Sequence, residues 1–426
     1  MPSGVPSTPS RTSIRKQRRR SHRRLRLGFA SVASVATIGS LLAGVSGSSA
    51  TTDPSYKTPA QLDAWYAPPA NLAILSNGDI IRSRENDINV SGFQSKSWQL
   101  LYKSTDAKGQ PVADSTTVLI PPTAWTGSGR RPLVSYQAAE DSVGANCAPG
   151  FALAGGTNAG IAGDAPGISQ VLQRGWAAAV PDYEGPESQF IVGPQAGHAV
   201  LDGLRAAQHF TTAGLSSQTP TALWGYSGGG NATAWAGELA ASYAPDLKLA
   251  GIAEGGVPAD LQMLVNLIDG GPFAGFDFVG VLGLWRAYPE MVIDKVVNAQ
   301  GKALLDANEN SCLTSILLQG AFKKLDDLTI RPGMINEPIY QQVLALNKLG
   351  QRKPNAPVFN YGAMFDEIVP TQGNDNIVAA YCKMGATVYK ERYLFAEHAT
   401  GLLWGFYGSL NFLSDRFAAK PAPSNC

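Results

Sequence analysis

The stretch Trp224-Gly225-Tyr226-Ser227-Gly228-Gly229-Gly230 decides the fold of this chain. Its pattern, Gly-x-Ser-x-Gly, is that of a nucleophile elbow, a strained turn from a strand into a helix that exposes a serine hydroxyl. In a chain with 46 glycines such a pattern also arises by chance as a plain turn. An apolar segment of strand length, 220–224, precedes it, however, and an alanine-rich segment of helical character, 231–241, follows it. We therefore expect Ser227 to be a nucleophile in acyl transfer, next to the amides at a helix N-terminus.

The histidines leave one choice for the general base. The chain has four of them, at His22, His198, His209 and His398. An α/β-hydrolase orders its triad along the chain as serine, acid and histidine, so the base must follow Ser227. His22 lies in a basic leader, and His198 and His209 lie in a segment of helical period where a capping or surface role is expected. His398 is therefore the predicted base.

The acid is expected on a loop after a buried strand. Residues 358–361 have strand character, Gly362 interrupts it, and Asp366 follows on the loop, which makes this carboxylate the predicted acid. Glu367 is the rival. Asp375 is a weaker candidate, because its position near a helix suits capping or exposure to solvent.

The order of segments after the acid is that of the last repeats of an α/β-hydrolase. A helix containing residues 377–381, a strand at 387–394 and a loop bearing His398 follow one another. The predicted mechanism is that Ser227 attacks an acyl carbonyl, His398 takes and returns the proton, and Asp366 orients the imidazolium.

The first fifty residues predict an export signal. Nine basic residues and no acidic residue come first, an apolar run covers 27–45, and small residues end at Ala50. The alternatives are a nucleic-acid-binding arm and a membrane anchor. The run is rich in Ser, Ala and Gly and barely reaches the length of a spanning helix, so we expect cleavage near Ala50 and a secreted or cell-envelope protein. Arg23-Arg24 leaves the choice between the Sec and twin-arginine routes open.

The rest of the composition is that of a large acidic enzyme domain. In 426 residues, 44% are hydrophobic and 16% are charged, enough for a large core. Without the nine basic residues of the leader, 25 basic and 33 acidic residues remain, so the net charge is about −8 in place of +1. This charge argues against nucleic acid as a partner, and four histidines with no CxxC pair give little support for a metal site.

The cysteines fit an exported chain. They are Cys147, Cys312, Cys382 and Cys426. An even number in a chain bound for an oxidising compartment predicts two disulfides, and the spacing alone leaves three pairings open, besides four reduced thiols.

An ordered series of segments resembles the secretory lipases over most of the mature chain. The segments are 78–84, 135–142, 181–185, 201–206, 225–229, 238–240, 242–245, 366–370 and 396–398. The resemblance implies an α/β-hydrolase fold, a mostly parallel sheet flanked by helices, that acts on acylglycerols or other hydrophobic acyl esters without a cofactor. The family's triad matches Ser227, Asp366 and His398, in agreement with the reasoning above.

The resemblance also implies an oxyanion hole and two disulfides. The hole would consist of the Gly228 amide and the side chain of Asp141, which can donate only when protonated and so requires a raised pKa. From the residues alone, Asp141 or Ser142 would instead cap a helix. The implied disulfides are Cys147–Cys312 and Cys382–Cys426.

Residues 257–353 are too many for one crossover connection and have apolar residues at helical spacing. In the family that it resembles, such an insertion forms a cap or lid that lines an acyl-chain tunnel. The predicted division is therefore an export signal at 1–50, a hydrolase core at 51–256 and 354–426, and a helical cap at 257–353.

The expected protein is thus a secreted ester hydrolase whose partner is its acyl-ester substrate, with transient contact to a lipid interface and no stable protein partner. A short-chain carboxylesterase, an acyltransferase, a peptidase or a polyester hydrolase would use the same triad. A non-catalytic lipid-binding protein is the alternative of another class, and the complete triad argues against it.

Overall fold

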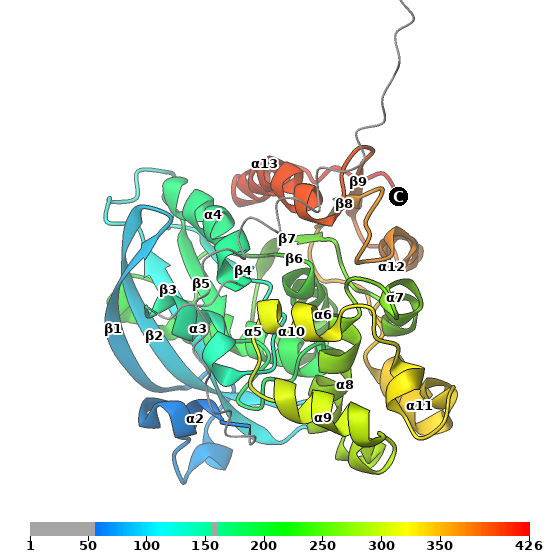
Figure 1. Cartoon of the computed structure of the whole chain (residues 1–426). Helices are drawn as coiled ribbons and strands as arrows, with labels where there is room; N and C mark the ends of the chain where they lie inside the picture. The colour runs from blue at the N-terminus through cyan, green and yellow to red at the C-terminus, as the bar shows by residue number, and fades with distance from the viewer. Residues whose placement is uncertain (1–55, 156–159) are drawn as a thin grey trace, which may run out of the picture. The chain divides into compact units, whose positions relative to one another are not determined.

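The computed structural model describes residues 56–155 and 160–426, so the predicted export signal at 1–50 lies outside it. A nine-stranded sheet has the order β1-β2-β3-β5-β4-β6-β7-β8-β9 (Figure 1). The strands are β1 (Ile80–Val90), β2 (Phe93–Thr105), β3 (Pro111–Ile120), β4 (Leu133–Gln137), β5 (Ala177–Pro181), β6 (Thr221–Tyr226), β7 (Leu249–Gly255), β8 (Val358–Ala363) and β9 (Val388–Tyr393). Strands β1, β2, β3 and β5 pair antiparallel, and the pairs from β5 through β9 are parallel.

Helices cover both faces of this sheet. They are α2 (Pro59–Leu62), α3 (Pro149–Leu153), α4 (Gly160–Gln173), α5 (Gly193–His209), α6 (Gly228–Tyr243), α12 (Thr371–Lys383) and α13 (His398–Phe417). Successive strand residues point to opposite faces: Leu223 packs in the apolar cluster under α5, α6 and α12, and Trp224 in the cluster under α4 and α13. Because both faces are covered, β4, β5, β6 and β8 are buried at every position. The predicted α/β-hydrolase fold, a mostly parallel sheet flanked by helices, is confirmed.

Between β7 and β8 the chain forms helices. They are α7 (Leu261–Ile268), α8 (Gly275–Ala287), α9 (Ala299–Asn308), α10 (Leu313–Gly320) and α11 (Pro338–Leu346), the yellow-green and yellow helices of Figure 1. Their apolar side chains pack with one another and with Phe190, Ile191 and Val192 in a cluster separate from the two that flank the sheet. We call residues 257–353 the cap segment; its boundaries as a domain stay a prediction.

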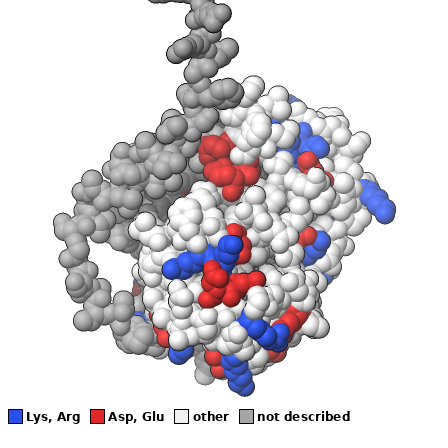
Figure 2. Space-filling model, turned by 45° about the vertical axis from the view of Figure 1, so that its right-hand side comes forward, with Lys and Arg blue, Asp and Glu red and all other residues white. Residues whose placement is uncertain are grey.

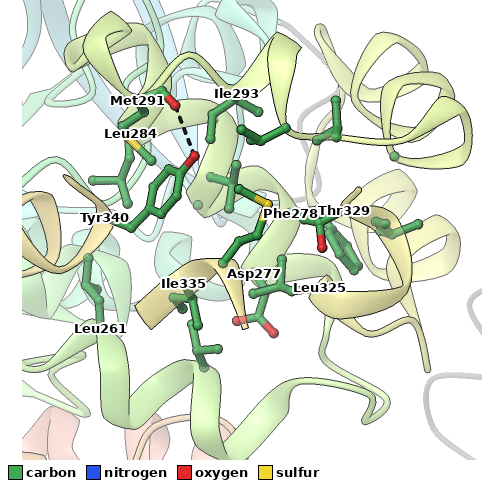
Figure 3. A pocket seen from close by; sticks show the side chains of 18 of the residues that line it. Leu261, Asp277, Phe278, Leu284, Met291, Ile293, Leu325, Thr329, Ile335 and Tyr340 are labelled. Atoms are coloured by element: carbon green, nitrogen blue, oxygen red, sulfur yellow. Dashed lines mark hydrogen bonds between the residues drawn. The ribbon is translucent and has the colours of Figure 1, made fainter. Parts of the chain in front are cut away.

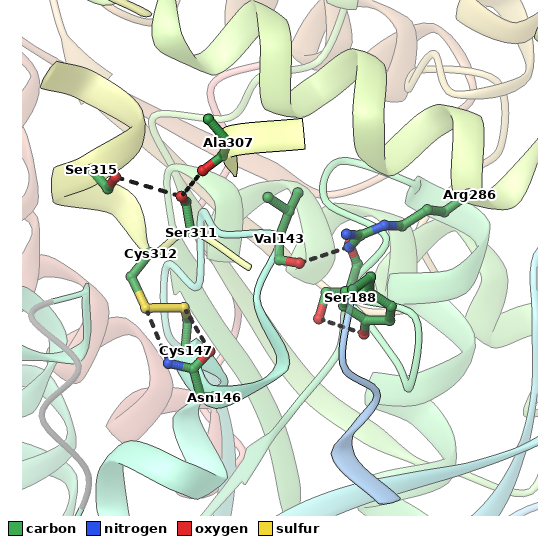
Figure 4. Close-up of a disulfide and its surroundings, with 10 residues drawn as sticks. Val143, Asn146, Cys147, Ser188, Arg286, Ala307, Ser311, Cys312 and Ser315 are labelled. Atoms are coloured by element: carbon green, nitrogen blue, oxygen red, sulfur yellow. Dashed lines mark hydrogen bonds between the residues drawn. A yellow bond between two sulfur atoms is a disulfide. The ribbon is translucent and has the colours of Figure 1, made fainter. Parts of the chain in front are cut away.

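Two disulfides fasten loops to this framework. Cys147, after β4, bonds to Cys312 at the start of α10, which ties a loop of the sheet to the cap segment (Figure 4). Cys382 in α12 bonds to Cys426. The C-terminal segment lies along β9, where the Asn425 backbone N–H donates to the Val388 carbonyl (3.0 Å) and the Asn425 side chain bonds both backbone groups of Lys390 (2.7 and 2.8 Å).

Two histidines differ from the expectation. His398 is not on a loop but is the first residue of α13, because Glu397 caps that helix by accepting from the amides of Ala399 and Thr400. His198 neither caps a helix nor stands free on the surface. Its ring stacks on Tyr243 with centroids 4.0 Å apart, and its Nδ1 lies 3.1 Å from the Thr105 carbonyl oxygen.

Among the described residues, no helix combines the length and the apolar character that crossing a bilayer requires.

Candidate active site

Ser227 occupies the turn between β6 and α6 in a strained conformation. Its φ is 57° and its ψ is −125°, a region that non-glycine residues rarely adopt. The Ser227 amide donates to the Gly255 carbonyl at 2.9 Å, which holds the turn against the end of β7. The serine side chain is thereby presented beyond the carboxyl end of the sheet, half-buried.

The glycines around the serine are required by close packing of the backbone. A Cβ atom at Gly225 would lie 2.3 Å from the Gly229 carbonyl oxygen, and one at Gly229 would lie 2.0 Å from that of Gln137. A side chain at Gly225 would force strand β6 and helix α6 apart, and one at Gly229 would force α6 away from the end of β4, so the turn depends on both glycines.

The structure brings Ser227, His398 and Asp366 together. The Ser227 Oγ lies 2.9 Å from His398 Nε2, and His398 Nδ1 lies 2.9 and 2.8 Å from the two carboxylate oxygens of Asp366. The three residues follow the parallel strands β6, β8 and β9, whose carboxyl ends lie at one edge of the sheet, with β7 between β6 and β8.

The rival carboxylates occupy other places. Asp366 faces the imidazole and also accepts from the backbone amides of Ile368 (3.1 Å) and Val369 (2.7 Å), which fixes its orientation. Glu367 accepts from the backbone N–H of His398 at 3.0 Å, so it holds the main chain of the histidine and not its ring. Asp375 pairs with Arg392 at 3.1 Å.

The surroundings of His398 make its imidazole more basic. Burial disfavours the charged ring, but the charge of Asp366 and the hydrogen bond to it outweigh burial, so the pKa of His398 is raised above its usual value. An imidazole with this partner is suited to take a proton from Ser227 and to hold it as an imidazolium.

Asp141 lies directly against Gly228, the first residue of α6. A Cβ at Gly228 would lie 2.0 Å from the Asp141 Oδ1, so the carboxyl occupies the space that a side chain would need. The first amides of a helix have no acceptor within the helix, and the Gly228 amide is therefore free to donate to a ligand. Asp141 has a φ of 43° and, like Ser142, precedes no helix start, because the next turn begins at Ala145. The capping alternative for both residues is thus wrong.

Burial of Asp141 raises the pKa of its carboxyl to about 6, and the charge of a protonated His398 works in the opposite direction. A carboxyl with a raised pKa retains its proton nearer to neutrality and can then donate a hydrogen bond.

Two further buried carboxyls, those of Glu140 and Glu184, lie near Asp141 and were not predicted from the sequence. Glu140 and Glu184 are buried, at 3% and 1% exposure. Burial raises the pKa of each carboxyl; the charge of Asp182 raises the pKa of Glu140 further, and the charge of Glu140 raises the pKa of Glu184 further. Two such neighbours cannot both ionise, so the pair retains a proton. The only sequence signal for these two residues was their place in segments that resemble the secretory lipases: Glu140 lies in 135–142 and Glu184 in 181–185.

Two pockets lie on either side of Phe190 and Ile191. A small one is lined by Gly228, Asn231, Phe190 and Ile191, among others. Phe190 and Ile191 also line a larger pocket whose walls come mainly from the cap segment (Figure 3). Phe190 and Ile191 thus form a wall common to both pockets, between the region beside the elbow and an apolar space between α7, α8, α9 and α11.

In the part of the chain that the structure describes, no group of three or more His, Cys, Asp or Glu side chains is placed to hold a metal ion.

Comparison with known proteins places these features in context. A family model described as secretory lipase matches residues 158–425, more than half of the chain. A lipase A from Moesziomyces aphidis is 33% identical over 83% of this chain and 79% of its own length. A secreted triacylglycerol lipase from Malassezia furfur is 34% identical over 85% of this chain and 77% of its own. A Mycobacterium tuberculosis protein that bears the name "Probable inactive lipase" is also 34% identical, over 84% of this chain and 82% of its own.

Solved structures agree with the sequence comparisons. Candida antarctica lipase A in its closed state has a TM-score of 0.80 and 32% identity, covering 85% of this chain and 89% of that one. A rice cell wall degrading esterase from Xanthomonas oryzae has a TM-score of 0.64 and 17% identity, over 81% of this chain and 99% of that one, which shows a common fold alone.

Proposed function

The chain belongs to the secretory lipase family, and we propose that it is an exported serine hydrolase that cleaves esters of hydrophobic acyl chains, acylglycerols foremost. One observation carries the proposal. Ser227, in the strained conformation of an elbow, is hydrogen-bonded to His398, which is hydrogen-bonded to Asp366. This arrangement generates an alkoxide-like nucleophile at neutral pH without a metal or cofactor.

In the proposed reaction, the Ser227 Oγ attacks the ester carbonyl while His398 Nε2 accepts its proton. The alcohol leaves with that proton, and an acyl group remains on Ser227. Water then attacks the acyl-enzyme with His398 as base, and the carboxylic acid departs. Asp366 holds the imidazole by its Nδ1 and stabilises its charged form throughout.

We propose that the oxyanion of the tetrahedral intermediate accepts from the Gly228 amide and from a protonated Asp141. Support comes from the contact between Asp141 and Gly228, beside Ser227, and from the burial that raises the pKa of the Asp141 carboxyl. Preorganised donors of this kind stabilise the charge that develops in the transition state.

The lining of the cap pocket favours long acyl chains. Its walls of Leu, Ile, Val, Phe and Met side chains, contributed mainly by four helices, suit a flexible hydrocarbon chain. Hydrolysis of short-chain esters does not require such a pocket, and an insoluble polyester would not enter it readily. The family member named as a secreted triacylglycerol lipase is consistent with this substrate class.

Exposed apolar side chains around the site suit contact with a lipid aggregate. They are Met364, Phe365, Leu394, Phe395, Leu403, Trp404 and Tyr407. The loops before Asp366 and His398 lie together, because the Met364 amide donates to Tyr393 at 3.0 Å and the Tyr393 and Trp404 rings contact each other. We propose that these seven exposed apolar side chains touch the substrate interface transiently. On the face of the molecule seen in Figure 2, uncharged surface surrounds small groups of acidic and basic residues.

Export and domain division are part of the proposal. The basic and apolar leader at 1–50 supports cleavage near Ala50 and release to the cell exterior, in keeping with the secreted family. The helices α7 to α11 and their own apolar cluster support residues 257–353 as a cap on the core formed by 51–256 and 354–426.

One relative is named as an inactive lipase, so a lipid-binding protein without turnover is the second candidate. In this chain the hydrogen bonds from Ser227 through His398 to Asp366 favour turnover.

Initial rates with p-nitrophenyl esters from acetyl to palmitoyl decide between the candidates. The mature protein is compared with Ser227→Ala and with Ser242→Ala, an exposed serine at the end of α6, as the matched control. We expect turnover at every chain length, a loss of at least ~10³-fold in Ser227→Ala and no loss in Ser242→Ala. Activity confined to the shortest esters would favour a carboxylesterase. No activity at any length, with lipid binding retained, would overturn the catalytic proposal.

A further inference from the structure

The cap pocket contains one carboxyl that the proposed reaction does not use. Asp277, in the first turn of α8, lines the pocket, and only 5% of its surface is exposed. Neither of its carboxylate oxygens has a hydrogen-bond partner among the described residues. Figure 3 shows its side chain among apolar neighbours that include Leu325 and Ile335.

The other polar groups at the pocket wall are already paired. The Tyr340 hydroxyl donates to the Met291 carbonyl at 3.2 Å, the dashed line of Figure 3. The Thr329 hydroxyl donates to the Arg331 carbonyl at 2.8 Å, and Asp326 accepts from the Gly333 amide at 2.7 Å. Asp277 is therefore the polar group of this wall that remains available to a ligand.

An unpartnered buried polar group is destabilising, and in folded proteins it needs a reason. Burial raises the pKa of Asp277 to about 8, and the charge of Asp269 adds to the rise. Asp269 is not a hydrogen-bond partner of Asp277; its own Oδ1 accepts from the Leu325 amide at 2.8 Å. Near neutrality Asp277 is thus an uncharged acid with one O–H donor and free acceptor positions. A hydroxyl group, which both donates and accepts, complements it; an ammonium ion would require it ionised.

The position of Asp277 in the pocket wall suggests which ligand would carry the complementary hydroxyl, namely an acyl chain bound in the pocket. Asp277, Gly280 and Leu284 lie on one face of α8, three and four residues apart, and all three line the pocket. A Cβ at Gly280 would lie 3.9 Å from the Ile191 side chain, and Ile191 also lines the small pocket beside Gly228. Asp277 lies about one helical turn, ~5 Å, from Gly280 along α8. We take the acyl chain to run from Ser227 along the wall formed by Ile191 and Gly280 toward Asp277.

We propose that Asp277 makes this pocket select acyl chains that carry a hydroxyl group along the chain over plain chains of the same length. The inference rests on the proposed function, because it takes the pocket as the site of the acyl group. In the complex, Asp277 donates its O–H to the chain hydroxyl, and that hydroxyl donates to the carbonyl oxygen of Asp277. A plain chain leaves the carboxyl unpaired, as in sites that reject substrates lacking a hydroxyl.

The test compares kcat/KM for p-nitrophenyl octadecanoate with that for its monohydroxy isomers, with the hydroxyl moved along the chain. Wild-type protein is expected to prefer one isomer, or a few neighbouring ones, by ~10-fold. Asp277→Leu should abolish or reverse the preference, whereas Asp277→Asn, which still donates and accepts, should retain most of it. Asp306→Asn, an exposed carboxylate of the cap segment, is the matched control and should keep the wild-type ratio.

Equal rates for all isomers in the wild type, or a preference that survives in Asp277→Leu, would overturn the inference while leaving Ser227-dependent ester hydrolysis standing. A separate readout does not need turnover. In Ser227→Ala protein, methyl hydroxyoctadecanoate should displace a fluorescent fatty-acid probe at lower concentration than methyl octadecanoate, and Asp277→Leu should remove the difference. Equal displacement by the two esters would also overturn the inference, even if the wild type hydrolysed no ester at all.

Discussion

The elbow region and the cap pocket lie side by side but are built differently. At the elbow, a few polar side chains are each fixed by hydrogen bonds: Ser227 to His398, His398 to Asp366, and Asp366 to two backbone amides. In the cap pocket, many apolar side chains from α7, α8, α9 and α11 form the wall together. Geometry at the elbow is therefore set by individual residues, whereas geometry in the cap is set by collective packing.

This difference predicts two patterns of sensitivity. A single substitution at the elbow removes a defined hydrogen bond and should cost orders of magnitude in rate. A substitution in the pocket changes only how well an acyl chain fits, so it should lower kcat/KM by a smaller amount that depends on the length of the acyl chain.

The largest effect is expected for the acid. Asp366→Asn leaves the shape intact but cannot hold the imidazole in the required tautomer, so kcat should fall by ~10⁴-fold. Glu367→Gln is the matched control, because an amide oxygen can still accept from the His398 backbone N–H; we expect less than ~10-fold loss. Steady-state kinetics with p-nitrophenyl butyrate measures both. Similar losses in the two variants would contradict the assignment of Asp366.

An intermediate effect is expected at the oxyanion hole. Asp141→Ala removes a donor and should lower kcat by ~10²–10³-fold. Asp141→Asn donates at every pH, whereas the wild-type carboxyl loses its proton as the pH rises through its pKa of about 6. The ratio of kcat in Asp141→Asn to kcat in the wild type should therefore increase with pH through this range. Both proteins also show a rise due to deprotonation of His398, which begins at a lower pH in Asp141→Asn because the charge of Asp141 contributes to the raised pKa of His398. A ratio that is constant with pH would show that Asp141 does not donate.

The smallest effect is expected in the pocket. Gly280 faces open space apart from Ile191, so Gly280→Leu should place a side chain in the path of the acyl group. We expect kcat/KM for the palmitoyl ester to fall by ~10-fold more than for the acetyl ester. Leucine has a higher helix propensity than glycine, so thermal unfolding should show no loss of stability. An equal fall at all chain lengths would argue that the acyl chain does not pass this position.

The same contrast explains what could be predicted from the sequence. Ser227, Asp366 and His398 were found because each follows a parallel strand in a fixed order along the chain, a local signal. Asp141 needed the resemblance to a family, since the residues alone favoured a helix cap that the structure does not contain. The helical start at His398 was missed because Glu397 is an unusual capping residue.

The pocket was beyond sequence reasoning for a physical reason. Its walls and the unpaired carboxyl of Asp277 arise only when α7, α8, α9 and α11 pack with the segment around Phe190 and Ile191, which lies far away in the chain. The buried pair Glu140 and Glu184 was missed likewise, because charged residues in a sequence are ordinarily expected at the surface.

The C-terminal segment has a consequence for solubility. Strand β9 ends the sheet, and an end strand can recruit a strand from another molecule and start aggregation. Here Asn425 already bonds the outward backbone groups of Val388 and Lys390, and the disulfide to Cys382 keeps it there. The chain thus shields its own sheet end. Reduction of that disulfide would uncover the strand, so a reducing medium should promote self-association before it affects catalysis.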